Sequence, residues 1–165
     1  MRWLIDGYNV IRRDPDLRGR ETESLEAGRT ALLAMVARVA RDLPDSFTVV
    51  FDGARRTGDA PGGGQVQVVF SRPPASADDE LRRLAATLRE GAVVVSSDRA
   101  VQDAARRAGA VALSAEAFLE AVETGSSEVD DDADDGEEQP RRGPSHRLSR
   151  AARAAERALR RLRNR

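Results

Sequence analysis

The chain has 165 residues, 27 basic and 28 acidic side chains and a formal net charge of −1, which suits one α/β domain with a substantial core and a short appendage. Cysteine is absent, which excludes disulfides, cysteine-ligated zinc sites and catalysis by a thiolate. Every basic residue is Arg, so the lysine of a Walker-type phosphate loop and a lysine Schiff base are excluded as well.

Apolar strands alternate with amphipathic helices over the first three quarters of the chain. In chain order, we predict a strand at 2–6, a helix at 25–42, strands at 47–52 and 65–70, a helix at 77–89, a strand at 93–95, a helix at 99–108, a strand at 111–113 and a helix at 115–123. Because strands joined by helices run parallel, this order predicts a three-layer α/β domain with a mainly parallel central sheet.

The longest predicted helix, at 25–42, has its large apolar side chains at helical spacing. Pro44 lies beyond its end, where it cannot interrupt the helical hydrogen bonds. The face that we expect to pack on the sheet comprises Leu25, Leu32, Leu33, Val36, Val39 and Leu43.

The C-terminal part of the chain separates into an acidic and a basic segment. Residues 127–139 carry eight acids and no base, a composition that cannot bury enough apolar surface to fold alone. We therefore divide the chain into a domain at 1–125, a disordered acidic linker at 126–144 and a basic amphipathic helical tail at 145–165. The apolar stripe of that tail is expected to comprise Leu148, Ala151, Ala152, Ala155, Leu159 and Leu162.

Acidic residues recur where the predicted strands end. Asp6 and Asp52 each close an apolar strand, and Asp98 follows another strand after two serines. The carboxyl ends of parallel strands meet at one edge of the sheet, where ligands bind. Ionised carboxylates repel one another unless a cation neutralises them, so this pattern predicts a divalent-metal site. Taken singly, Asp98 could instead be a helix N-cap and Asp52 part of a plain turn.

A fourth candidate carboxylate lies at the start of the predicted helix at 77–89. The helical phase places Asp78 beside the sheet-facing stripe and Asp79 nearly opposite, so Asp78 is the better inward ligand. Acids also favour a first helical turn for their own sake, and Ser76 with Asp79 is typical of a capping box. Both interpretations of Asp78 stay open at this point.

Four short motifs, taken together, resemble those of YacP-like NYN domains, a branch of the PIN-like nuclease superfamily. They read IDGYNVI at 5–11, VFDG at 50–53, ADDEL at 77–81 and VSSDRAVQ at 95–102. The resemblance implies a PIN-like fold and a metal-dependent endoribonuclease that uses Mg²⁺ or Mn²⁺. The positions that match the family's acids, and so imply catalysis and metal binding, are Asp6, Asp52, Asp78 and Asp98, with Asp79 as an auxiliary candidate and Asn9 in the aspartate-to-asparagine signature.

The resemblance also suggests partners. Some relatives in this branch cleave ribosome-associated mRNA, which makes RNA the expected substrate and the ribosome a candidate partner. Because no apolar run approaches the roughly 20 residues of a membrane span, we expect a soluble, cytoplasmic protein without a membrane partner. The oligomeric state is not predicted.

Further residues are candidates for supporting roles. Asn9 and Ser97 could orient a phosphate or a metal ligand, although ordinary turn hydrogen bonding explains them equally well. Tyr8 could stack on a base or pack beneath a loop. Arginines that follow the first two acidic positions are expected to bind substrate phosphates: Arg12, Arg13, Arg55 and Arg56.

Several alternatives remain. His146, the single histidine, lies outside the predicted domain, which excludes a two-histidine RNase mechanism. A haloacid-dehalogenase-type phosphatase needs an Asp two residues after its nucleophile. Tyr8 occupies that position after Asp6, so the sequence argues against this class of phosphatase. An RNA-binding module with a weak nuclease site, another metal-dependent phosphatase and a DNA nuclease stay open. For the basic tail, contact with RNA or the ribosome, docking or self-association, and no defined role are the three possibilities.

Overall fold

The computed structural model describes residues 1–53, 63–127 and 149–165. The strands are β1 (Arg2–Asp6), β2 (Ser46–Phe51), β3 (Val66–Phe70), β4 (Ala92–Val95) and β5 (Val111–Leu113). The helices are α1 (Gly7–Arg13), α2 (Pro15–Glu23), α3 (Leu25–Asp42), α4 (Ala77–Leu88), the short 3₁₀ turn η1 (Arg89–Gly91), α5 (Arg99–Arg107), α6 (Ala115–Ser127) and α7 (Arg150–Arg163). None of these described helices is both long and apolar enough to cross a lipid bilayer.

The sheet is parallel throughout, with strand order β3-β2-β1-β4-β5. β1 lies at its centre, where Ile5 pairs with Val49 on one side and Val95 on the other. Helices cover both faces, which explains why the strands are nearly continuous runs of buried apolar residues. The predicted three-layer α/β fold with a parallel sheet is confirmed.

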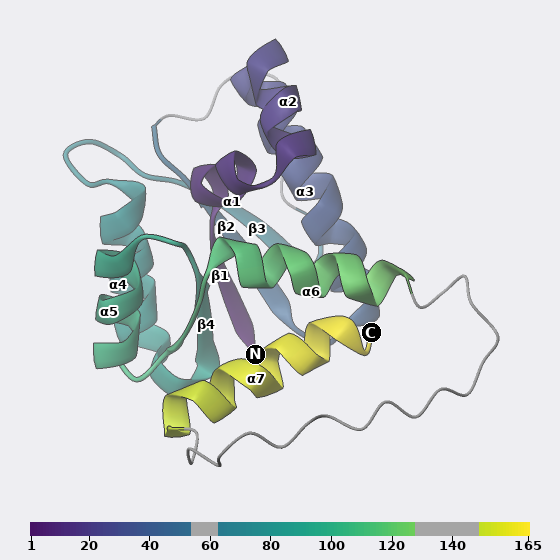
Figure 1. Cartoon of the computed structure of the whole chain (residues 1–165). Helices are drawn as coiled ribbons and strands as arrows, with labels where there is room; N and C mark the ends of the chain where they lie inside the picture. The colour runs from purple at the N-terminus through teal and green to yellow at the C-terminus, as the bar shows by residue number, and fades with distance from the viewer. Residues whose placement is uncertain (54–62, 128–148) are drawn as a thin grey trace, which may run out of the picture.

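The two faces of the sheet are covered by different sets of helices (Figure 1). α4 and α5 lie side by side on one face, where Leu81 and Val101 pack on Leu4 and Val94. The other face carries the larger core, in which α1, α3, α6 and α7 pack around Trp3. The segments that directly follow β1, β2 and β4 therefore lie between the two helical layers at one edge of the sheet, here called the carboxyl edge.

The elements predicted between residues 2 and 123 agree with the structure to within one residue at each end, with one exception. α6 extends to Ser127, four residues beyond its predicted end, so residues 126 and 127 are helical and do not belong to the linker. The rest of the predicted linker, from 128 on, lies outside the described residues. Leu25, expected on the buried face of α3, is 43% exposed because it lies at the first position of the helix.

Two helices between β1 and α3 were not predicted. Asp6 caps α1 and Asp14 caps α2, each accepting a hydrogen bond from a backbone N–H three residues on. α2 buries a single residue, Leu17, so it lacks the apolar periodicity by which longer helices are recognised. Its signals are the Asp14 cap and Pro15 at the first helical position.

The C-terminal helix differs from the tail predicted for 145–165. α7 starts at Arg150 and packs against α6 and β5, with Ala158 and Leu162 fully buried in the larger core. Its buried stripe runs through Ala154 and Ala158, whereas Ala151, predicted to lie on that stripe, is exposed. Leu148 lies outside the described residues. Docking on the domain is therefore one role that the helix has; binding of RNA stays a prediction.

At the opposite edge of the sheet, here called the amino edge, Asp45 forms two ion pairs and a further hydrogen bond with other described residues. The side chain of Asp45 is 1% exposed and accepts hydrogen bonds from the Met1 ammonium at 2.8 Å and the Trp3 indole at 3.1 Å. Arg161 of α7 forms a third contact, at 2.8 Å. Burial by itself would raise the pKa of Asp45, but these hydrogen bonds and positive charges outweigh it and lower the pKa.

Candidate active site at the carboxyl edge

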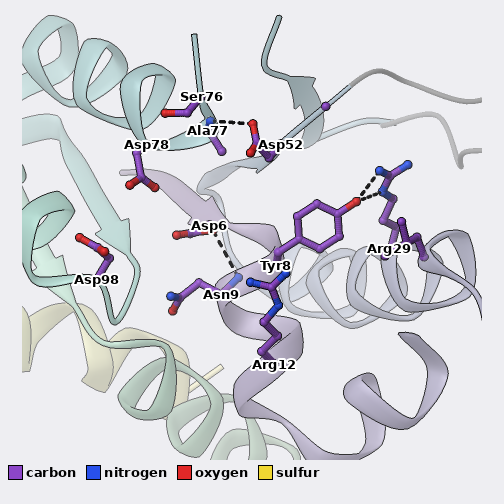
Figure 2. Close-up of a pocket in the computed structure, with 12 residues that line it drawn as sticks. Asp6, Tyr8, Asn9, Arg12, Arg29, Asp52, Ser76, Ala77, Asp78 and Asp98 are labelled. Atoms are coloured by element: carbon purple, nitrogen blue, oxygen red, sulfur yellow. Dashed lines mark hydrogen bonds between the residues drawn. The ribbon is translucent and has the colours of Figure 1, made fainter. Parts of the chain in front are cut away.

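A pocket of about 700 Å³ lies at the carboxyl edge and gathers all four predicted carboxylates (Figure 2). We call it the acid pocket. The end of β1, the residue after β2, the first turn of α4 and the N-cap of α5 each contribute one carboxylate to it. Its lining residues are Asp6, Tyr8, Asn9, Arg12, Leu25, Arg29, Asp52, Gly53, Ser76, Ala77, Asp78 and Asp98.

Asp6 is the most enclosed of the four carboxylates, at 8% exposure. One oxygen accepts the Asn9 backbone N–H at 3.3 Å and the other accepts the Ser96 hydroxyl at 2.8 Å. Gly7 holds the backbone here close to β2, because a Cβ at this position would lie 2.2 Å from the Phe51 ring. The carboxylate is therefore fixed at the junction of β1 and α1 by two hydrogen bonds and by tight packing behind it.

Asp52 follows β2 directly and is oriented by the strand beside it. One oxygen accepts the Ser71 hydroxyl at 2.6 Å and the Ala77 backbone N–H at 3.3 Å. The Ala77 N–H belongs to the first turn of α4, so Asp52 also neutralises part of the positive end of that helix. Ser71 and Ser96 were not singled out from the sequence, although both directly follow the end of a strand.

Asp78 and Asp79 separate as the helical phase predicted. Asp78 lines the acid pocket, whereas Asp79 lies outside it and forms a capping box with Ser76. The hydrogen bonds from Ser76 lower the pKa of Asp79, and Arg82 forms an ion pair with it at 3.3 Å. The geometry thus gives Asp79 a role in starting α4.

Asp98 is a helix cap and also a residue of the pocket, so the two interpretations of its position are compatible. It caps α5 through the Val101 N–H at 3.0 Å, and it also lines the acid pocket. Asn9 lines the pocket as well and accepts the Ser97 backbone N–H at 2.8 Å, which ties α1 to the loop after β4. Ser97 is not among the lining residues; its hydroxyl donates to Glu116 and accepts from the Ala115 N–H.

Two carboxylates of the acid pocket, Asp6 and Asp78, have raised pKa values. Burial raises the pKa of Asp6, and the charges of Asp78 and Asp98 raise it further, against the lowering effect of its two hydrogen bonds. The pKa of Asp78 is also raised, first by burial and then by Asp98. Arg82, whose guanidinium lies 3.9 Å from the Asp78 carboxylate, lowers the pKa and offsets this only in part. A cation in the pocket would relieve this repulsion.

The donor set fits a hard divalent cation. Mg²⁺ and Mn²⁺ prefer carboxylate oxygens, and the acid pocket offers four carboxylates without a competing thiolate or imidazole among its lining residues. As the side chains stand, no three acidic or histidine groups of the described residues form a compact ligand cluster. The fit therefore rests on the kind of ligands that share the pocket and on their mutual repulsion.

A buried arginine that the sequence did not reveal forms the opposite wall of the pocket. Arg29 of α3 is 4% exposed and donates to the Tyr8 hydroxyl through Nε at 2.8 Å and through Nη2. Its guanidinium lies 5.1–5.5 Å from the ring centres of Tyr8, Phe51 and Phe70. Arg29 thus fixes Tyr8, and Figure 2 shows the Tyr8 ring between Arg29 and the acids. In the sequence, Arg29 looks like any polar residue of an amphipathic helix.

The predicted substrate-binding arginines have different positions. Arg12 lines the acid pocket, and its guanidinium lies 5.8 Å from the centre of the Tyr8 ring. Arg13 lies outside the pocket and forms an exposed ion pair with Glu116 at 2.9 Å. Arg55 and Arg56 lie outside the described residues.

Comparison with known proteins agrees with this fold. A family model of the YacP-like NYN domain matches residues 3–163, a span that includes α7. The YacP protein of Bacillus subtilis (strain 168) is 32% identical over 126 residues, which cover 73% of this chain and 74% of that protein.

Two solved structures are also similar. The crystal structure of Rae1 (YacP) from Bacillus subtilis has a TM-score of 0.67 and 29% identity, covering 78% of this chain and 77% of its own. The crystal structure of a mutant of the same Bacillus subtilis protein has a TM-score of 0.61 and 24% identity, covering 81% and 86%. The fold is therefore PIN-like, and the chain belongs to the YacP-like NYN domain family.

Proposed function

We propose that this protein is a metal-dependent endoribonuclease that hydrolyses RNA phosphodiester bonds in the acid pocket. The observation that carries the proposal is the meeting of Asp6, Asp52, Asp78 and Asp98 in one pocket, from four separate segments of the chain. NYN domains are nuclease-like members of the PIN superfamily, which agrees with this chemistry. Arg12 and Arg29, which also line the pocket, supply positive charge for a polyanionic substrate.

The four carboxylates would hold Mg²⁺ or Mn²⁺. When bound, such a cation polarises a phosphodiester and makes water a better nucleophile at neutral pH. We expect Asp6 to be the central ligand, because Ser96 and Asn9 fix both of its oxygens in place. We expect Asp52 to keep its orientation through Ser71.

The other residues of the pocket would place the RNA. Arg12 is exposed and lies at the pocket wall, where its guanidinium can bind a phosphate oxygen next to the scissile bond. Tyr8, held by Arg29, presents a fixed aromatic ring on which a base can stack. Because water and not the ribose 2′-hydroxyl would attack, the products should carry a 5′-phosphate and a 3′-hydroxyl.

The test is a cleavage assay with the purified full-length chain. Single-stranded RNA, structured RNA, DNA of the same sequence and a phosphomonoester are each incubated with Mg²⁺, with Mn²⁺ and with EDTA. We expect RNA cleavage with either metal, none with EDTA, and restoration when metal is added back. RNA binding without cleavage would replace the proposal with an RNA-binding module, and hydrolysis of DNA or the phosphomonoester alone would replace it with one of the other activities.

A further inference from the structure

A second depression lies beside the acid pocket and is lined by arginines. It has a volume of about 390 Å³ and is formed by α1 and α2; we call it the α1–α2 groove. Its lining residues are Arg12, Arg13, Pro15, Arg18, Gly19 and Thr22. Three of these six carry a positive charge and none is acidic.

Arg12 joins this groove to the acid pocket, because it lines both. It lies near the end of α1, one helical turn beyond Tyr8, and its guanidinium lies near the Tyr8 ring. A chain bound across the acids could therefore continue past Tyr8 and Arg12 into the groove without leaving the surface of the protein.

The positive charge of the groove is available to a ligand. Arg18 is exposed and forms no ion pair with another described residue. Arg13 is paired with Glu116, but both side chains are about half exposed, so a phosphate can compete for it. Two acids lie close by in the sequence. Asp14 is buried and caps α2, and Asp16, in the first turn of α2, is exposed but does not line the groove.

We propose that the α1–α2 groove binds the sugar-phosphate backbone of single-stranded RNA on one side of the scissile bond, with Arg12 at the junction. This inference rests on the proposed function and adds a subsite to it. Four carboxylates at the cleavage site repel the phosphates of the substrate, so a flanking strand gains affinity only where cations lie next to them. The groove is a cationic surface that is continuous with the acid pocket.

The experiment varies the length of RNA on each side of one cleavage position. Oligonucleotides are extended one nucleotide at a time at the 5′ or the 3′ flank, and kcat and KM are measured for each. We compare wild type, Arg18→Gln, Arg18→Glu and the control Arg107→Gln. Arg107 is an exposed arginine in the last turn of α5 that lines neither the acid pocket nor the groove.

For wild type, kcat/KM should rise as one flank gains its first nucleotides and then level off, while the other flank has little effect. Arg18→Gln should lose this rise through a several-fold higher KM with kcat unchanged, and Arg18→Glu should lose more. Arg107→Gln should behave as wild type. An Arg18→Gln enzyme with the wild-type flank dependence would overturn the proposal.

Fluorescence anisotropy of the same RNAs in EDTA separates this inference from the proposed function. If wild type does not cleave but binds RNA more tightly with one longer flank, and Arg18→Gln does not, the groove is retained and the nuclease assignment fails. The slope of log affinity against log salt should then fall by about 0.7 for the lost phosphate contact. Flank-independent binding, or no binding of RNA by wild type, would reject the groove.

Discussion

Two buried aspartates lie at opposite ends of the same sheet and have opposite electrostatic surroundings. Asp45, at the amino edge, accepts hydrogen bonds from the Met1 ammonium, Trp3 and Arg161, and its pKa is lowered. Asp6, at the carboxyl edge, accepts only uncharged donors among the described residues, and burial together with neighbouring acids raises its pKa. The same residue type is thus stabilised as an anion at one edge and destabilised as an anion at the other.

This difference is the one expected between a charge that stabilises a fold and a charge that serves a binding site. A fully paired carboxylate such as Asp45 joins β1 and α7 to the start of β2 and needs no ligand. Ionised carboxylates that lie close together repel one another when no neighbouring positive charge offsets them. A bound cation can remove this free-energy cost. Variants at the two edges test whether the carboxyl edge serves function and the amino edge stability.

The largest expected effect is on catalysis at the carboxyl edge. Asp6→Asn, Asp52→Asn and Asp98→Asn should each lower kcat by at least about 100-fold, because each removes a negative charge that would hold the catalytic cation. Asp103→Asn, which removes an exposed acid of α5, should retain full activity. Unchanged cleavage by two of the three variants would contradict the site assignment.

The same variants test the cation without relying on activity. Because the pKa of Asp6 is raised, its charged form costs stability at neutral pH, so Asp6→Asn should melt no lower than wild type in EDTA. Mn²⁺ should raise the melting temperature of wild type and leave that of Asp6→Asn unchanged. Equal metal-induced shifts for both proteins would place the cation elsewhere.

At the amino edge, the expected effect is on stability and not on turnover. Asp45→Asn leaves cationic donors without their carboxylate, and we expect a loss of about 2 to 3 kcal/mol in the free energy of unfolding at pH 7. Since the pKa of Asp45 is lowered from 3.8, its contribution is complete above about pH 4 and is lost as the pH falls through the lowered value.

Denaturant unfolding of the two proteins at pH 7 and at pH 3 checks this prediction. The difference between wild type and Asp45→Asn should narrow at pH 3, whereas Asp103→Asn should differ from wild type by less than about 1 kcal/mol at both. A difference that does not change with pH would show that Asp45 acts through packing and not through its charge.

A smaller contrast is expected within the first turn of α4. Asp78→Asn should lower kcat by about tenfold or more, because Asp78 lines the acid pocket. Asp79→Asn should leave kcat unchanged and lower the stability slightly through the weaker capping box. If Asp79→Asn lowers turnover while stability stays constant, Asp79 and not Asp78 serves the pocket.

The acid pocket could be predicted largely from the sequence because it depends on strand ends. In a parallel sheet, residues that follow buried strands must meet at one edge, which places Asp6 and Asp52 without knowledge of packing. Helical phase alone separated Asp78 from Asp79. The strand-end acids themselves predicted a divalent-metal site, whereas Mg²⁺ or Mn²⁺ and an RNA substrate were expectations that only the family resemblance implied.

Features that depend on packing between distant segments were not predictable. Arg29 is buried only because Tyr8, Phe51 and Phe70 surround it, and these residues come from three separate elements. The docking of α7 depends on Leu162 meeting the larger core, which its narrow apolar stripe does not reveal. The charge composition predicted a separate tail. The helix instead packs on the domain through a few buried side chains, Ala158 and Leu162 among them.

The docked position of α7 changes how its positive charge must be tested. Removing the helix would uncover the core around Leu162, where even a single large-to-alanine change costs about 2 to 5 kcal/mol. Truncation would therefore mix loss of folding with loss of binding. Substitution of its outward arginines avoids this, because Arg153, Arg157 and Arg160 are exposed and form no ion pair with other described residues.

We expect the smallest effect from the triple variant Arg153→Gln, Arg157→Gln and Arg160→Gln. Its affinity for RNA or ribosomes, measured by anisotropy and by co-sedimentation, should fall several-fold at low salt and approach wild type as salt rises, because each phosphate contact releases condensed counterions. Turnover at saturating RNA should not change, since none of the three lines the acid pocket. A double variant at Arg41 and Arg107, two exposed arginines on α3 and α5, controls for net charge. If both variants lose the same affinity per arginine removed, the effect comes from the total charge of the protein. A larger loss of affinity per arginine in the α7 variant would show that α7 is a binding surface as well as a part of the fold.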